Sequence, residues 1–401
     1  MLMKKEVAAG ILVIVLLLAF GTGVVFWMLK NNEEKVSQKE IEIKEHLEAN
    51  CELIYPFYAS LDEEGRGYYV KLCAGFDEHL DSVEIIKSSK KSDIDEAISW
   101  VNDNYRKVAY EQPDYFWINP NSFTIKEITQ NKKYALNIDI KYTLTEEEVE
   151  EKKPEYDAVV KNIVDEAIAK EYLFDAVLYV YDNILERTDY DHDLAESTDT
   201  NLLGYSAYGC LIEGKTVCSG YTLAFTSIMQ KLGIICGAEF DANAENENAE
   251  SSHVWNYCKL GEDYYYFDLT WDDNGFDSKE LKPYLDYTHD FFAITTKELS
   301  YTHDALKADP TAPSCTAEKY NYYTQKALYC EEYSLEEFKR IAKNQPQDDY
   351  MVIKFGSVAE RAKAEKDLFK RNNFYEVFPE MKGVKYIKGS SGLQLYLFFD
   401  N

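Results

Sequence analysis

Residues 217–233 read VCSGYTLAFTSIMQKLG, and this stretch decides the fold of the region around it. Its apolar residues recur at steps of three and four, which predicts a helix that begins at Cys218 and that Gly233 closes. Unpaired N–H groups and the helix dipole stabilise a thiolate at a helix amino terminus, so Cys218 is a candidate nucleophile. A free cysteine is more often a small buried apolar residue, and position alone favours that role. The expected buried face consists of Tyr221, Ala224, Phe225, Ile228 and Leu232.

Two stretches downstream alternate with a period of two and predict a β-hairpin. They are SHVWNY at 252–257 and YYYFDLT at 264–270, with the turn LGED between them. If the loop has two or four residues, Trp255 lies opposite Asp268, and His253 lies on a diagonal to Asp268 on the same face. A lone histidine in a strand is usually structural, but a carboxylate on the same face favours a functional pair.

Cys218, His253 and Asp268 together have the composition of a nucleophilic triad. The thiolate would attack an acyl carbon, the imidazole would move the proton, and the carboxylate would fix the imidazole tautomer. Each residue type has a separate task in this chemistry, so the hypothesis is that all three residues act together in one site.

Three motifs resemble the bacterial transglutaminase-like superfamily, which has a papain-like α+β fold. They are VCSGY, SHVWN and YYFDLTWDD, with 35 residues from Cys218 to His253 and 15 from His253 to Asp268. SAYG and LIEGK, just before the cysteine, also resemble the family, and the similarity is specific over about 171–305. DNYRKVAYEQPDYFWI at 103–118 is more loosely similar to membrane-anchored members. The resemblance implies that Cys218, His253 and Asp268 are the triad, whereas members include transglutaminases, peptidases, cyclising or deamidating enzymes and inactive binding modules.

The oxyanion-stabilising group is harder to assign, because no obvious glutamine or tryptophan precedes Cys218. Tyr208, ten residues upstream, is the candidate beside the Cys218 backbone N–H, and a packing role for Tyr208 is equally open. Trp255 is a second candidate for contact with the oxyanion or the substrate.

Residues 209–216, GCLIEGKT, match the phosphate-binding loop pattern G-x-x-x-x-G-K-[ST]. Such a loop follows a buried apolar strand, whereas NLLGYSAY precedes this one. The loop interior should also be small, but it contains Leu211 and Ile212. We therefore expect no nucleotide binding.

The composition narrows the function class further. The 401 residues contain 43 Lys and Arg against 72 Asp and Glu, a net charge of −29, which argues against nucleic-acid binding. A hydrophobic content of 46% excludes disorder of the whole chain. The eight cysteines contain no CxxC pair and no zinc-ligand spacing, so neither a metal nor a cofactor is expected.

Residues 7–29 form an uncharged run long enough to span a hydrocarbon core of about 30 Å. The run ends in FWMLK without a small-residue cleavage site, which favours an uncleaved anchor over a signal peptide. Basic residues flank this apolar run at both ends, so their distribution does not decide how the run is oriented in the membrane. We expect the amino terminus inside and the rest outside a cell membrane, because a long acidic domain after one early hydrophobic segment is usually translocated.

The predicted organisation places two small α+β domains on either side of the transglutaminase-like core. The first has helices at 57–80 and 93–107 and strands at 121–130 and 134–142, and the last has a strand at 350–356, a helix at 358–372 and strands up to 399. The core is expected to start with a helix after Lys153-Pro154. The expected segments are an anchor at 1–30, a charged stalk at 31–50, an N-terminal domain at 51–150, the core at 154–310 and a C-terminal domain at 331–401.

The function hypothesis is a membrane-anchored cysteine enzyme that transfers or hydrolyses extracellular peptide or protein amides. Its partners would be peptide or protein substrates, including cell-wall or surface proteins. The alternative is a catalytically silent module of the same fold that binds or scaffolds at the cell surface. The acidic loop 241–248 is either a lid that prefers cationic substrates or, more simply, a solvated loop.

Overall fold

The computed structural model describes residues 35–51, 54–197, 199, 202–241, 253–274, 280–303, 312–343, 345 and 350–400. The predicted anchor at 7–29 and nearly all of the acidic loop 241–248 lie outside these residues. Within the described ranges, no helix is long and apolar enough to cross a membrane. The described residues divide into two compact units, one within 35–51, 61–101 and 124–140, the other within 54–60, 102–123 and 141–400.

The first unit is built on a three-stranded antiparallel sheet. β1 (Ser82–Ser88), β2 (Ile118–Gln130) and β3 (Lys133–Tyr142) have the order β1-β3-β2, and β2 and β3 correspond to the two predicted strands. α3 (Glu63–Asp77) and the start of α4 (Lys91–Glu111) belong to this unit. Residues 35–51 are also helical. β1 was not predicted, because SVEIIKS is short and does not alternate strictly.

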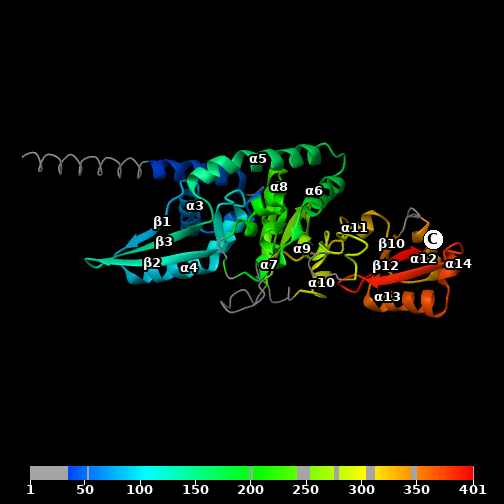
Figure 1. Ribbon diagram of the computed structural model, residues 1–401. Coiled ribbons are helices and arrows are strands. Elements are labelled where there is room, and N and C mark those ends of the chain that lie inside the picture. Colours follow the sequence, from blue (N-terminus) through cyan, green and yellow to red (C-terminus); the bar gives the residue numbers. More distant parts are fainter. Residues whose placement is uncertain are drawn as a thin grey trace, which may run out of the picture. The chain divides into compact units, whose positions relative to one another are not determined.

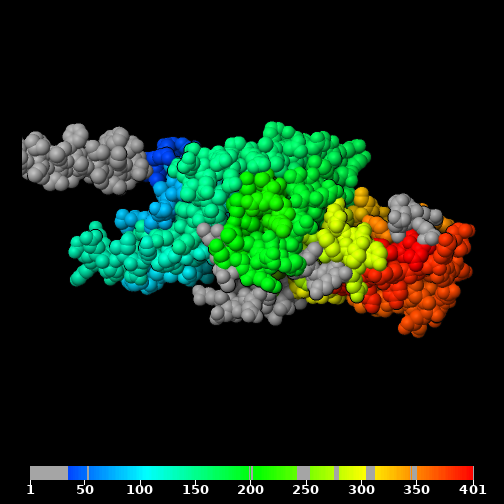
Figure 2. All heavy atoms as spheres, viewed as in Figure 1, coloured from blue at the N-terminus to red at the C-terminus, as the bar shows by residue number. Residues whose placement is uncertain are grey.

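The second unit contains a helical layer and a central sheet (Figure 1). α5 (Glu146–Ile168) packs against α6 (Leu173–Arg187), and α8 (Cys218–Lys231) packs against both of them and against the sheet. The sheet consists of β6 (Cys236–Phe240), β7 (Val254–Leu260) and β8 (Asp263–Phe267) in the order β6-β7-β8. The helix α5 lies at the surface of the unit, with one face buried (Figure 2). Short elements join these parts: α2 (Pro56–Ser60), β4 (Asp189–Tyr190), α7 (His192–Ala195), β5 (Lys215–Thr216), α9 (Leu269–Asp272), α10 (Thr296–Leu299) and α11 (Tyr322–Gln325).

α5 differs from the prediction, because it begins eight residues before Pro154 and continues through it. A capping box between Thr145 and Glu148 starts the helix. Pro154 removes one backbone N–H, but both Pro154 and Glu150, whose carbonyl loses this donor, are exposed residues. The expected junction before the core is therefore helical.

Residues beyond 320 form a four-stranded sheet with helices packed on it. β9 (Tyr329–Cys330), β10 (Tyr350–Phe355), β11 (Gly383–Lys388) and β12 (Gln394–Asp400) have the order β11-β12-β10-β9. The helices are α12 (Leu335–Ala342), α13 (Val358–Glu365) and α14 (Phe374–Val377). The predicted strand, helix and final strands are confirmed, whereas the division of the chain into three domains stays a prediction.

Candidate active site

Cys218 is the first residue of α8, as predicted. The two-residue strand β5 leads into it and pairs in parallel with β4. The helix can begin here because Gly220 has no side chain: a Cβ at Gly220 would lie 1.8 Å from Thr216 Oγ1 and 2.8 Å from the Ser206 carbonyl oxygen. The helix ends in a Schellman motif in which Gly233 has φ +72°. Local sequence therefore sets both ends of the helix that carries the thiol.

The β-hairpin has the predicted register. Leu260 pairs with Asp263 across a two-residue turn, and Asn256 pairs with Phe267. β8 ends at Phe267, earlier than predicted, because Asp268 caps α9 by accepting the Trp271 N–H with Oδ1 at 3.1 Å. The other carboxylate oxygen of Asp268 lies 2.6 Å from His253 Nε2.

The charges in the site favour an ion pair. Burial opposes protonation of His253, but the Asp268 carboxylate and a hydrogen bond with the Cys218 side chain outweigh it and raise the His253 pKa to about 10. Burial acts in the other direction on Asp268, yet His253 and His303 hold the pKa of this carboxyl well below its usual range. The imidazole of His253 thus contacts both the Asp268 carboxylate and the Cys218 side chain.

His303 is the residue of this site that the sequence interpretation missed. Its Nε2 lies 2.9 Å from Asp268 Oδ2, the same oxygen that His253 contacts. His303 follows α10 in a turn that has neither a period nor a motif, and 35 residues separate it from Asp268. Only the tertiary fold brings it to the carboxylate.

His253, Asp268 and His303 are also the group in the described part of the chain whose donor atoms could hold a metal ion, since these atoms lie within 4.8 Å of one another. Both imidazole Nε2 atoms, however, are engaged by the same carboxylate oxygen. A metal ion bound here would have to displace the Nε2 protons of His253 and His303 and break the hydrogen bonds of both imidazoles with Asp268. The hydrogen-bonded arrangement is complete without one.

The two candidate oxyanion residues are placed differently. Tyr208 is buried against Phe116, with ring centroids 5.0 Å apart, and its hydroxyl donates to Glu155 at 3.3 Å. Trp255 is stacked on His253 at 5.6 Å, and its buried Nε1–H has no hydrogen-bond partner among the described residues. Tyr208 thus has the contacts of a packing residue and Trp255 those of a wall beside the imidazole, while the oxyanion role of either stays a prediction.

Three tyrosines that were not predicted interact electrostatically with Cys218. Burial raises the pKa of Tyr110, Tyr190 and Tyr205, and an electrostatic interaction with Cys218 adds a smaller contribution in the same direction. Tyr205 donates to the Leu194 carbonyl at 2.8 Å.

Residues 209–216 do not form a phosphate-binding loop. Gly209–Glu213 is a π-turn that follows a 3-10 turn, Leu203–Tyr205, and no strand of the described chain leads directly into it. The hydroxyl of Thr216 donates to the Gly204 carbonyl at 2.5 Å. This arrangement agrees with the expectation from the sequence.

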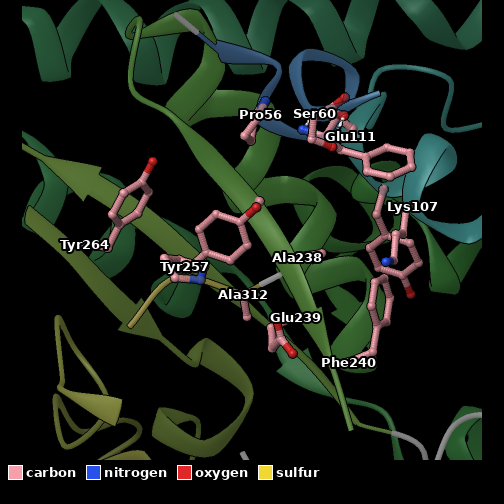
Figure 3. A pocket seen from close by; sticks show the side chains of 14 residues that line it. Pro56, Ser60, Lys107, Glu111, Ala238, Glu239, Phe240, Tyr257, Tyr264 and Ala312 are labelled. Carbon is pink, nitrogen blue, oxygen red and sulfur yellow. Dashed lines mark hydrogen bonds between the residues drawn. The ribbon is translucent and has the colours of Figure 1, made fainter. Parts of the chain in front are cut away.

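A cavity of about 200 Å³ lies at the edge strand β6 (Figure 3). Its walls come from α2, α4, the strands β6, β7 and β8, and residues 312–313. Gly237 has no side chain, which leaves room for the ring of Tyr257. Tyr110, one of the tyrosines influenced by Cys218, is also part of the wall. The charged residues of the lining are Lys107, Glu111 and Glu239.

Residues 157–269 match the transglutaminase-like superfamily. This part of the chain is a transglutaminase-like domain. The matched range includes all three triad residues and ends before His303.

Two solved structures are similar to the chain at a distance. One is a crystal structure of a TGase, with 15% identity and a TM-score of 0.25, covering 41% of this chain and 49% of that one. The other is a "putative cysteine protease" from Cytophaga hutchinsonii, with 16% identity and a TM-score of 0.23, covering 38% of this chain and 63% of that one. The similar regions thus span only part of both proteins. No curated protein matches the sequence.

Proposed function

We propose that the transglutaminase-like domain is a thiol enzyme that transfers or hydrolyses the acyl group of peptide or protein amides. The observation that carries this proposal is the contact of the His253 imidazole with both partners: the Asp268 carboxylate at 2.6 Å and the Cys218 side chain through a hydrogen bond.

The proposed reaction has two steps that the same three residues perform. Cys218 Sγ attacks the carbonyl carbon, and the protonated His253 gives its proton to the leaving amine, which leaves a thioester. In the second step His253 takes a proton from water or from an acceptor amine, which attacks the thioester and releases Cys218. Asp268 keeps the imidazole oriented throughout. Whether water or an amine resolves the thioester depends on how well the site excludes water.

The cavity beside β6 supports a peptide or protein substrate. It lies next to a strand edge and shares Tyr110 with the surroundings of the thiol. Residues 7–29 would anchor the enzyme in a cell membrane with the amino terminus inside, so that its substrates are extracellular, cell-wall or surface proteins.

Turnover by the full chain tests the proposal. Peptide libraries, and glutamine peptides with amines, are offered to the wild type, to Cys218→Ala and to Cys51→Ala, which changes the other partly exposed cysteine. Turnover that Cys218→Ala abolishes and Cys51→Ala preserves supports the enzyme. Absence of turnover with every substrate, together with ligand binding that Cys218→Ala leaves unchanged, would support a silent binding module.

The location is tested separately with protease added to intact cells. We expect residues 51–401 to be cut. Protection of this part until the cells are broken would contradict both the topology and the extracellular substrate class.

A further inference from the structure

His303 holds the site carboxylate together with His253. Asp268 Oδ2 accepts from His253 at 2.6 Å and from His303 at 2.9 Å, while Oδ1 accepts the Trp271 N–H at 3.1 Å. With one donor on Oδ1 and two on Oδ2, the carboxylate cannot rotate without breaking a charge-assisted hydrogen bond. A single donor on Oδ2 would leave the orientation of His253 less restricted.

The surroundings of His303 keep its ring in place. Its Nδ1 is 2.8 Å from Thr302 Oγ1, and its backbone N–H donates to the Leu299 carbonyl at 2.9 Å. Three aromatic rings enclose the imidazole, which leaves its side chain only 3% exposed. They are Trp255 and Trp271, both with centroids at 4.8 Å, and Phe291 at 5.6 Å. A buried histidine held in this way presents one nitrogen to one acceptor.

The turn that carries His303 is itself anchored. α10 begins with a capping box between Thr295 and Glu298, and Glu298 also forms an ion pair with Lys354 of β10. Both partners of this ion pair are largely buried. The position of His303 therefore depends on residues far outside the range that matches the family.

We propose that His303 is a positioning residue of the site: its second hydrogen bond to Asp268 Oδ2 fixes the carboxylate that orients His253 toward Cys218. The inference rests on the proposed function, in which His253 forms an ion pair with the Cys218 thiolate. His303 itself touches neither the thiol nor the substrate in this role.

The test measures how fast Cys218 is alkylated by iodoacetamide, because this rate reports the thiolate and needs no known substrate. Full-length protein is labelled between about pH 5 and about pH 9, and mass spectrometry resolves Cys218 from the other cysteines. The variants are His303→Leu, which removes the donor, and His303→Gln, which keeps an N–H at the end of the side chain. The matched control is His289→Gln, because His289 also contacts a carboxylate, Asp182 at 2.7 Å, away from the thiol.

We expect His303→Leu to slow alkylation at about pH 6 by about tenfold to a hundredfold, the range for losing a hydrogen bond to a charged group. His303→Gln should recover most of this loss, and His289→Gln should leave the rate unchanged. The acid edge of the labelling profile should move to higher pH in His303→Leu, because a less firmly oriented His253 stabilises the Cys218 thiolate less. The groups that face the Asp268 carboxylate are His253, His303 and the Trp271 N–H. The Tyr181 hydroxyl donates to the backbone carbonyl of Asp268 and to the side chain of Asp272.

A merely structural role would change thermal unfolding and the labelling of buried cysteines without moving the acid edge. Alkylation of folded His303→Leu within about twofold of the wild type would overturn the inference, as would His303→Gln that is as slow as His303→Leu. If His303→Leu does not fold, Thr302→Val is used in its place, because it removes the hydroxyl that contacts His303 Nδ1. Labelling of Cys218 that is about threefold slower supports the inference, and an unchanged labelling profile overturns it. Stoichiometric zinc in the purified protein that is lost in His303→Gln would also overturn it.

The same experiment separates this inference from the proposed function. If His253→Ala leaves the alkylation of Cys218 unchanged, the ion pair is absent and the proposed function fails. If His253→Ala slows it while His303→Leu does not, only the inference about His303 fails.

Discussion

Replacing Asp268 with asparagine tests the charge arrangement of the site most directly. The amide has nearly the same shape and keeps one oxygen for the Trp271 N–H that Oδ1 accepts. At the other atom, however, an NH₂ group replaces Oδ2 and faces two imidazole Nε2 atoms that also donate. The substitution therefore removes the charge that holds His253 protonated without opening a cavity.

The size of the effect follows from the pKa of His253. Its rise from 6.5 to about 10 corresponds to about 5 kcal/mol of favourable interaction with Asp268 and Cys218, beyond the cost of burial. Because the pKa is raised, this stabilisation is fully present below about pH 6.5 and is lost as the pH rises through about 10. We expect Asp268→Asn to lower the free energy of unfolding at about pH 7 by at most about 5 kcal/mol.

The assay is the titration of ¹³C-labelled histidine followed by NMR, combined with urea unfolding. In the wild type, His253 should stay protonated through neutral pH, whereas in Asp268→Asn it should titrate near its ordinary value. The alkylation of Cys218 at about pH 6 should slow by about a hundredfold, because an ordinary thiol is less than about 1% ionised there. Cys218 should remain accessible at alkaline pH. A wild-type His253 that titrates near 6.5, or one that keeps its high pKa in Asp268→Asn, would refute the reasoning.

Four further predictions concern the thiol, its helix and the groups around them. Cys218 should be the cysteine that iodoacetamide modifies fastest at about pH 6, as ranked by mass spectrometry, and an ordinary rate would contradict an assembled ion pair. In a urea titration, Gly220→Ala should lower the free energy of unfolding by about 1–3 kcal/mol, because the new Cβ would overlap the backbone and Thr216. The control Gly67→Ala, whose Cβ would have nothing within 4 Å, should be neutral or stabilising in the same titration. Tyr208→Phe should change turnover by less than about threefold if its contacts are those of packing, whereas a loss of about a hundredfold in kcat would restore its oxyanion role. EDTA should leave both turnover and alkylation unchanged, because hydrogen bonds already engage every candidate metal donor, and inhibition reversed by added zinc would contradict this.

Much of the site could be predicted because its parts are local. The helix from Cys218 to Gly233 depends on apolar spacing and on a glycine that accepts φ +72°. The register of the hairpin depends on a short turn, which determines that His253 and Asp268 share a face. Both patterns are complete within about 20 residues, so the sequence alone placed Cys218 at a helix start and His253 beside Asp268, while their catalytic roles stay a prediction.

The remaining features depend on contacts between distant segments. His303 reaches Asp268 because α10 is anchored by the ion pair of Glu298 with Lys354, and no local pattern marks that contact. The hydroxyl of Tyr208 is used by Glu155, which α5 supplies, and that helix passes through Pro154 because the proline faces solvent. By itself the sequence determined which residues can carry the chemistry, since spacing and turn geometry act over a few residues. Only the tertiary structure decided which other groups restrain them, because burial and hydrogen bonding between remote segments exist only after the chain has folded.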